Sequence, residues 1–351
     1  MKKMIFTLFA AAVGTLSMFA QDDRIATLNH GTTLTTFTGD SALVQAYNSA
    51  ADGDVITLSP GVFVAVKTMN KTITVRGAGY KPMASNGYTS TQITGDFRVE
   101  IPSDGKSTFQ LEGIHFLDRV RIVGEKSLPV ALIKSKFGYP VYANGVNMKA
   151  VHCVFFDLSA GNNLTENIGN ASRSTTLNCQ NCVIGEVGCQ GLINSILNKI
   201  QATNCVLKAS TSGIPYSTIV NSIIMSPDVN SNYPLPETCV AHNCIGINNG
   251  GTQDIFSKLD DPSNVMVDGA REAAYTAVFK TLKDVKNPTL IETFELTDAA
   301  KTTYLGDDGT QVGIYGGVSP FTLEPTSPQV TKFIVSSTTE GSQLKVKINV
   351  E

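Results

Sequence analysis

Basic side chains gather in one stretch of the sequence, where they could contact an anionic ligand. Arg119 and Arg121 flank Val120, and the alternation of a strand places Val120 inside and both arginines outside. Stacked on neighbouring units of a repeat, such positions would form a basic patch suited to an acidic sugar chain. The patch has three interpretations: a solvated face, a carbohydrate-binding surface, or a catalytic site in which lysine is the base and arginine holds the sugar carboxylate. The ligand-binding candidates are His115, Arg119, Arg121, Lys134 and Lys136, with Lys126 between them.

Other residues that could bind a metal or take part in redox chemistry give weaker signals. Asp307 and Asp308 offer the hard oxygen ligands that calcium prefers, but their surroundings are typical of a turn. Cys179 and Cys182 form a C-x-x-C that lacks a second pair for zinc and the βαβ context of a redox motif. We therefore predict no catalytic residue, no metal and no cofactor; calcium stays possible without support. The histidines, which show no metal-ligand spacing, are His30, His115, His152 and His242.

The elements that position these residues belong to a repeat. A short phrase, often Asn followed by a small residue and two apolar ones, recurs with a mean spacing of about 22 residues, which indicates stacked supersecondary units. The asparagines would form a column at a corner, because Asn tolerates a left-handed backbone. A further copy at 194–197 does not fit the spacing. The small positions are Gly113, Ser135, Cys153, Cys182, Cys205, Ser222 and Cys244, and the asparagines are Asn181, Asn204, Asn221 and Asn243.

The cysteines fit this repeat better than a disulfide framework. The chain has 7 cysteines, an odd number, and four of them occupy the same small position of the repeat. A free cysteine behaves as a small buried hydrophobe, so these four predict a stacked interior column. A pair between Cys179 and Cys189 stays open.

The segment 40–80 has the clearest local pattern. Residues 41–51 place Leu43, Ala46, Tyr47 and Ala50 on one helical face, and Ser41 is a plausible N-cap. Short strands follow, in the stretches GDVITLSPGVF (53–63) and ITVRGAG (73–79). This order resembles the opening of right-handed parallel β-helix proteins of the pectate-lyase-like type, in which a helix caps the first coil. We therefore predict an all-β fold: a right-handed single-stranded parallel β-helix with an N-terminal capping helix and a short C-terminal β-hairpin.

The resemblance implies a fold more than an activity. Relatives of this type include pectate lyases, polygalacturonases and pectin esterases, but their catalytic signatures are missing; for example, Ala65 stands where the esterases have glutamate. The stretch 305–317 is similar to the phrase that closes the coil in secreted β-helix proteins of Bacteroidetes-like bacteria. The resemblance favours a non-catalytic protein that binds polysaccharide or a cell-surface partner along one wall. The alternative is a polysaccharide lyase or related carbohydrate-active enzyme acting on acidic glycans.

The ends of the chain and its composition complete the prediction. Lys2 and Lys3 precede an apolar stretch, 4–19, that is short for a membrane span and typical of a secretory signal peptide cut after Ala20. The net charge of −3 leaves no basic footprint for nucleic acid. We expect an exported monomer, in the periplasm, on the outer surface or outside the cell, with no membrane span in the mature chain. The predicted divisions are a signal peptide (1–20), a lead-in (21–40), the β-helix (41–320), and a linker with a hairpin (321–351).

Overall fold

The structure is a computed structural model of the whole chain, and its described part begins at Arg24. The predicted signal peptide lies outside it. No helix within the described part is long and apolar enough to cross a membrane. The described residues are 24–81, 90–101, 108–156, 158–160, 174–189, 198–209, 216–225, 234–247, 254–267, 269, 272–282, 294–324, 330–340 and 343–350.

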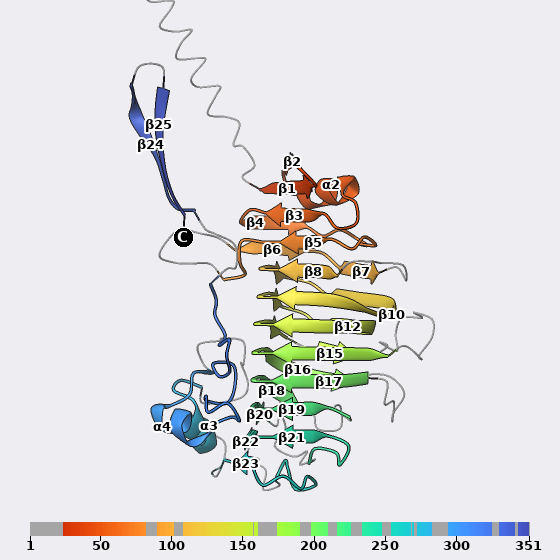
Figure 1. Cartoon of the computed structure of the whole chain (residues 1–351), viewed down its shortest axis with the longest axis vertical. Helices are drawn as coiled ribbons and strands as arrows, with labels where there is room; N and C mark the ends of the chain where they lie inside the picture. The colour runs from red at the N-terminus through yellow and green to blue at the C-terminus, as the bar shows by residue number, and fades with distance from the viewer. Residues whose placement is uncertain are drawn as a thin grey trace, which may run out of the picture.

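The chain folds into a parallel β-helix, as the sequence predicted (Figure 1). Each coil contributes strands to up to three walls, and strands of successive coils pair in parallel. The first wall contains β7 (Phe97–Ile101), the starts of β10 (Val120–Ile133) and β12 (Val141–Val151), β14 (Leu158–Ala160) and the end of β16 (Val183–Cys189).

The second wall is the longest, and the third meets it at a sharp corner. The second wall contains β3 (Val55–Leu58), β5 (Thr74–Arg76), β8 (Phe109–Glu112), the ends of β10 and β12, β15 (Thr175–Gln180), β17 (Asn198–Thr203), β19 (Thr218–Val220) and β21 (Val240–His242). The third contains β4 (Gly61–Val64), β6 (Thr91–Thr94), β9 (His115–Phe116), β11 (Lys136–Phe137), β13 (Val154–Phe155), the start of β16, β18 (Val206–Ala209), β20 (Ile223–Met225), β22 (Ile245–Ile247) and β23 (Val265–Met266).

A helix and a hairpin cap the N-terminal end. The helix α2 (Ala42–Ser49) buries its apolar face, including Leu43, as predicted. Ser41 occupies the N-cap position, as predicted, but its side chain makes no cap hydrogen bond to a backbone amide; its hydroxyl accepts from the side chain of Gln45. The predicted lead-in contains an antiparallel hairpin, β1 (Ile25–His30) and β2 (Thr33–Thr38), and β1 continues the second wall by pairing with β3.

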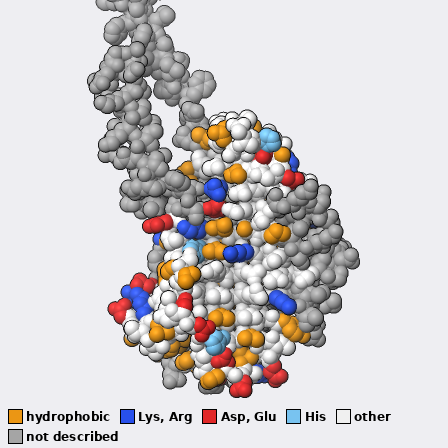
Figure 2. Space-filling view, viewed as in Figure 1, with side chains coloured by type: hydrophobic (Ala, Val, Ile, Leu, Met, Phe, Trp, Pro, Cys, Tyr) orange, Lys and Arg blue, Asp and Glu red, His pale blue; other side chains and the backbone are white. Residues whose placement is uncertain are grey.

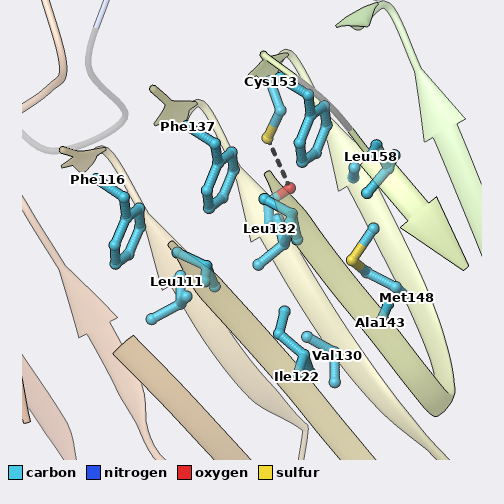
Figure 3. Close-up of a cluster of buried hydrophobic side chains, with 14 of the residues drawn as sticks. Leu111, Phe116, Ile122, Val130, Leu132, Phe137, Ala143, Met148, Cys153 and Leu158 are labelled. Carbon is cyan, nitrogen blue, oxygen red and sulfur yellow. Dashed lines mark hydrogen bonds between the residues drawn. The ribbon is translucent and has the colours of Figure 1, made fainter. Parts of the chain in front are cut away.

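The interior is filled by side chains that stack from coil to coil. Phe116, Phe137 and Phe155 lie on successive coils, with neighbouring ring centroids 5.1 and 4.9 Å apart and nearly parallel planes (Figure 3). All three rings are buried. Because side chains alternate along a strand, the residues beside them face outward.

The small positions form an interior column that also makes hydrogen bonds. The Cys153 thiol donates to the carbonyls of Leu132, on the preceding coil, and of Val151, at 3.3 and 3.4 Å (Figure 3). Cys182, Cys205 and Cys244 repeat the arrangement, and Ser135 and Ser222 bond the carbonyl two residues before them. The described cysteines are free and buried, Cys179 included, so a Cys179–Cys189 disulfide is not present.

The corner column holds a left-handed backbone, as predicted for its asparagines. Gly113 also has a positive φ, of 66°. Its amide donates to the carbonyl of Ile133, the residue before the corner residue Lys134 on the next coil, as the amide of Lys134 does to Val151. Gly113 therefore belongs to the corner, and our alignment of it with the small positions was wrong by one residue. Val183 pairs with Val206, so one coil separates Cys182 from Cys205, and the copy at 194–197 lies outside the described residues. The other corner residues are Lys134, His152, Asn181, Asn204, Asn221 and Asn243.

The C-terminal part turns back along the outside of the coil. Among the described residues, the last strand of the parallel sheet ends at Met266, whereas we placed the end of the β-helix at residue 320. Helices α3 (Glu272–Val278) and α4 (Asp298–Thr303) and the segment 305–324, which we call the strap, pack on the third wall. The stretch 305–317 thus lies across the corner column and does not close the last coil. The outward residues that this part covers are Val154, Val183, Val206, Ile223 and Ile245.

The final strands form the predicted hairpin, β24 (Val330–Glu340) and β25 (Gln343–Val350). They pair antiparallel with each other in a sheet separate from the coil. Figure 1 shows the hairpin beside the coil, away from the end formed by β21, β22 and β23.

Candidate functional site

The predicted basic residues divide among the walls. His115 and Lys136 are register neighbours on the third wall, whereas Arg121 lies on the first wall and Arg119 in the bend before it. Lys134 occupies the corner between the second and third walls. The side chain of Lys126 lies outside the described part of the structure. The structure therefore brings His115 and Lys136 together but does not gather all the candidates on one wall.

Two of these cations already have protein partners. Arg121 approaches the carboxylate of Asp96 at 3.7 Å, with only 14 % of its side chain exposed. The Lys134 ammonium donates to the backbone carbonyl of Glu324 at 2.6 Å, which ties the corner to the end of the strap. Burial lowers the pKa of Lys134, although the carboxylates of Glu324 and Glu112 act in the opposite direction. These contacts make Lys134 a structural cation.

His115 does not add positive charge to the surface at neutral pH. Burial, and to a lesser extent the neighbouring charge of Lys136, lowers the pKa of His115 to about 4. A neutral imidazole donates and accepts hydrogen bonds but does not attract anions.

A hollow on the second wall offers a better-defined surface. It has a volume of about 320 Å³ and lies over β12, β15 and β17. This wall faces the viewer in Figures 1 and 2, where its surface is mostly uncharged, with a few separate basic side chains. The lining residues are Lys149, Asn178, Cys179, Gln180, Gln201 and Thr203.

Strand register explains why these side chains share one surface. Lys149, Asn178 and Gln201 are direct partners on successive strands, and Gln180 is paired in the same way with Thr203. All of them point outward, because the residues between them are inward-facing. The rows are thus spaced by the distance between paired strands, about 4.8 Å.

The hollow is equipped for hydrogen bonding. Its amides supply both donors and acceptors, the Thr203 hydroxyl supplies one of each, and Lys149 supplies a cation. The Asn178 amide donates to Asn147 at 3.0 Å, which orients it and leaves its carbonyl oxygen for other partners. No carboxylate is among the lining residues that the structure describes.

Asp307 and Asp308, the carboxylates that we considered for calcium, make hydrogen bonds within the chain. Asp307 accepts hydrogen bonds from Asn243 and His242, at 2.6 and 3.0 Å. Asp261 bonds the other imidazole nitrogen at 2.7 Å, so the two carboxylates lie on opposite sides of the ring and do not converge on one cation. Asp308 accepts from the amide and hydroxyl of Thr310, as expected for a turn. This cluster fastens the strap to the last coils.

Comparison with protein-family models, curated proteins and solved structures found no match to this chain. The hollow must therefore be interpreted from its own chemistry. Its residues could have been found by counting back from each corner asparagine: Gln180 and Thr203 directly precede Asn181 and Asn204. We missed them because basic residues were taken as the functional signal.

Proposed function

We propose that this protein is exported and binds polysaccharide, without catalysis, along the second wall of its β-helix. The hollow over β12, β15 and β17 carries the proposal. Sugars present hydroxyl groups that both donate and accept, and the amides of Asn178, Gln180 and Gln201 can bond such groups in both senses. Its volume of about 320 Å³ falls at the lower end of the usual range for binding pockets.

The shape of the wall favours an extended ligand. Polar side chains hold the same outward position on three successive coils, in the row Lys149, Asn178 and Gln201, so a polymer lying along the coil axis meets a polar group at each of these steps. Lys149, at one edge of the hollow, would contact an acidic substituent on such a chain. A cell-surface partner that carries the same glycan would bind in the same way.

A binding assay with matched variants tests the proposal. The wild-type protein should be retained on part of a glycan array, and the double substitution Gln180→Ala, Gln201→Ala should weaken that binding at least tenfold. Gln92→Ala is the control, because it removes the same side chain from the third wall. Absence of glycan binding by the wild type, or equal binding by the double variant, would contradict the proposal.

The enzymatic alternative has a separate readout. Incubation with pectin, alginate and glycosaminoglycans should produce no absorbance from unsaturated sugars. If such products appear and the substitutions Arg121→Ala and Lys136→Ala abolish them, the protein is a lyase and the basic residues form its site.

The export proposal rests on residues 1–20, and it is tested by fractionating cells and sequencing the mature N-terminus. We expect mature protein starting at Gln21 in an exported fraction. Full-length protein in the cytoplasm would refute export.

A further inference from the structure

The N-terminal end of the second wall is an open sheet edge. Strand β2 pairs with β1, β1 pairs with β3, and no other strand in the described part of the chain pairs with β2. The strand TLTTFT is exposed along nearly its whole length, and Leu34 is 69 % exposed. Natural proteins protect such edges with charges, proline or bulges, because unpaired backbone groups attract another strand. This strand has none of these devices.

The surface around this edge also resembles an interface. From Gly31 to Ala51, which includes β2 and α2, Asp40 is the single charged residue. Depletion of charged residues is what distinguishes the centres of protein interfaces from the rest of a surface. Two identical copies could approach here without repulsion between like charges.

We propose that β2 pairs antiparallel with β2 of a second copy of this chain, which joins two coils head to head. Such a pair is isologous, since both copies use the same strand, and it closes as a dimer. The proposal goes beyond the glycan-binding function and replaces the monomer that we expected from the sequence.

The hairpin fixes the register of the pairing. A two-residue turn at Gly31 and Thr32 joins β1 to β2, with His30 opposite Thr33. In an antiparallel ladder the backbone groups of alternate residues point to opposite edges. Because Thr33 bonds His30 beside the turn, the backbone N–H and C=O groups of Leu34, Thr36 and Thr38 point to the open edge of β2. All three residues find a partner only if the twofold axis passes through Thr36. Leu34 then pairs with Thr38 of the second copy, and Thr36 pairs with Thr36 of the second copy.

The same axis determines where the hollows lie. A twofold axis between antiparallel strands stands perpendicular to the sheet, so both copies present the same face. The second walls then form one continuous sheet with both hollows on one side. If the proposed glycan binding is correct, one long polysaccharide can occupy both hollows. Binding at the second hollow is then intramolecular, so the dimer retains the polysaccharide more tightly than a single copy would.

Cysteine trapping and mass measurement test the dimer. With Thr36 opposite itself, the Cα atoms lie about 5.5 Å apart, within the range of a disulfide. Thr36→Cys should form a covalent dimer under mild oxidation. Thr302→Cys, at an exposed position on α4, should not, and neither should the wild type, whose described cysteines are buried. Light scattering should give twice the chain mass for the wild type and the monomer mass for Thr36→Lys, with unchanged circular dichroism.

Each result decides the proposal independently of glycan binding. A wild type that is monomeric at its highest soluble concentration overturns it. A dimer that survives Thr36→Lys, or Thr36→Cys trapping no faster than Thr302→Cys, also overturns it, because the contact then lies elsewhere. A dimer without glycan binding leaves this inference standing and refutes the proposed function alone.

Discussion

Asn181 connects the coil to the strap, and its substitution is the sharpest test of how the fold is held together. Its side-chain amide donates to the carbonyls of Ile314 and Gly316, both at 2.8 Å, and the residue is fully buried. Its backbone is left-handed, with φ at 48°. Asn181 thus contributes to the free energy of unfolding in two separable ways, through its side-chain hydrogen bonds and through its left-handed backbone.

Two substitutions separate them. Asn181→Gly keeps the left-handed backbone but leaves two buried carbonyls without their donor, at about 1 to 2 kcal/mol each. It also removes the buried Asn181 Oδ1, which has no hydrogen-bond partner, and this offsets part of the cost, so we expect a net loss of about 1 to 3 kcal/mol. Asn181→Ala loses the same donor and keeps a Cβ in the left-handed region, which alanine tolerates less well than asparagine, so its cost should exceed that of glycine by about 1 to 2 kcal/mol. Alanine should therefore destabilise the protein more than glycine, although glycine is the more flexible residue.

The free energy of unfolding is measured by urea titration with far-ultraviolet circular dichroism, since the chain has no tryptophan. A label on Val318→Cys, a strap position that is 93 % exposed, reports whether the strap detaches first. Asn243→Gly is the control, because its amide bonds the exposed Asp307, and we expect a cost below about 1 kcal/mol. A neutral Asn181→Gly, or equal costs for Asn181→Gly and Asn243→Gly, would refute this account of the strap.

Two further predictions concern the cysteine column and the cluster of His242, Asp261 and Asp307 that fastens the strap, which we call the latch. Hydrogen bonds to Asp261 and Asp307 raise the pKa of His242 above 6.5, so its stabilising charge is complete below that value and lost as pH rises through the folded pKa. The melting temperature of the wild type should therefore fall from pH 6 to 8 more than that of Asp307→Asn; parallel curves would show that the latch is not coupled to protonation. For the column, Cys205→Ser should change the free energy of unfolding by less than about 1 kcal/mol, since Ser222 fills the same position, whereas Cys205→Val should cost about 1 to 3 kcal/mol by overpacking. Similar costs for both would contradict the hydrogen-bonding role of this position.

Local sequence patterns were sufficient to predict the coil. The spacing of Cys182, Cys205 and Cys244, the asparagines before them and the alternation around them each follow from contacts between adjacent coils. Every coil repeats the same geometry, so the same residue types recur. The error at Gly113 arose because glycine fits both the small position and the left-handed corner, and only strand pairing distinguishes them.

The candidate site was harder to predict, since it depends on which surfaces stay uncovered. Lys134 resembled a ligand-binding residue in the sequence, but the strap occupies it. Val154 and Val183 are apolar at outward positions, and this is a signal, missed at the sequence level, that another element packs there. The uncharged side chains of the hollow carried no signal of their own until strand register placed them together.

The sequence by itself determined the β-helix, its helical cap and its buried thiols, because these depend on residues one coil apart, whose spacing is visible along the chain. Only the tertiary structure decided where residues 305–324 lie, which basic residues are occupied, and which sheet edge stays open. Those outcomes depend on contacts between segments far apart in the chain, such as Asn181 with Ile314, and no periodic pattern records them.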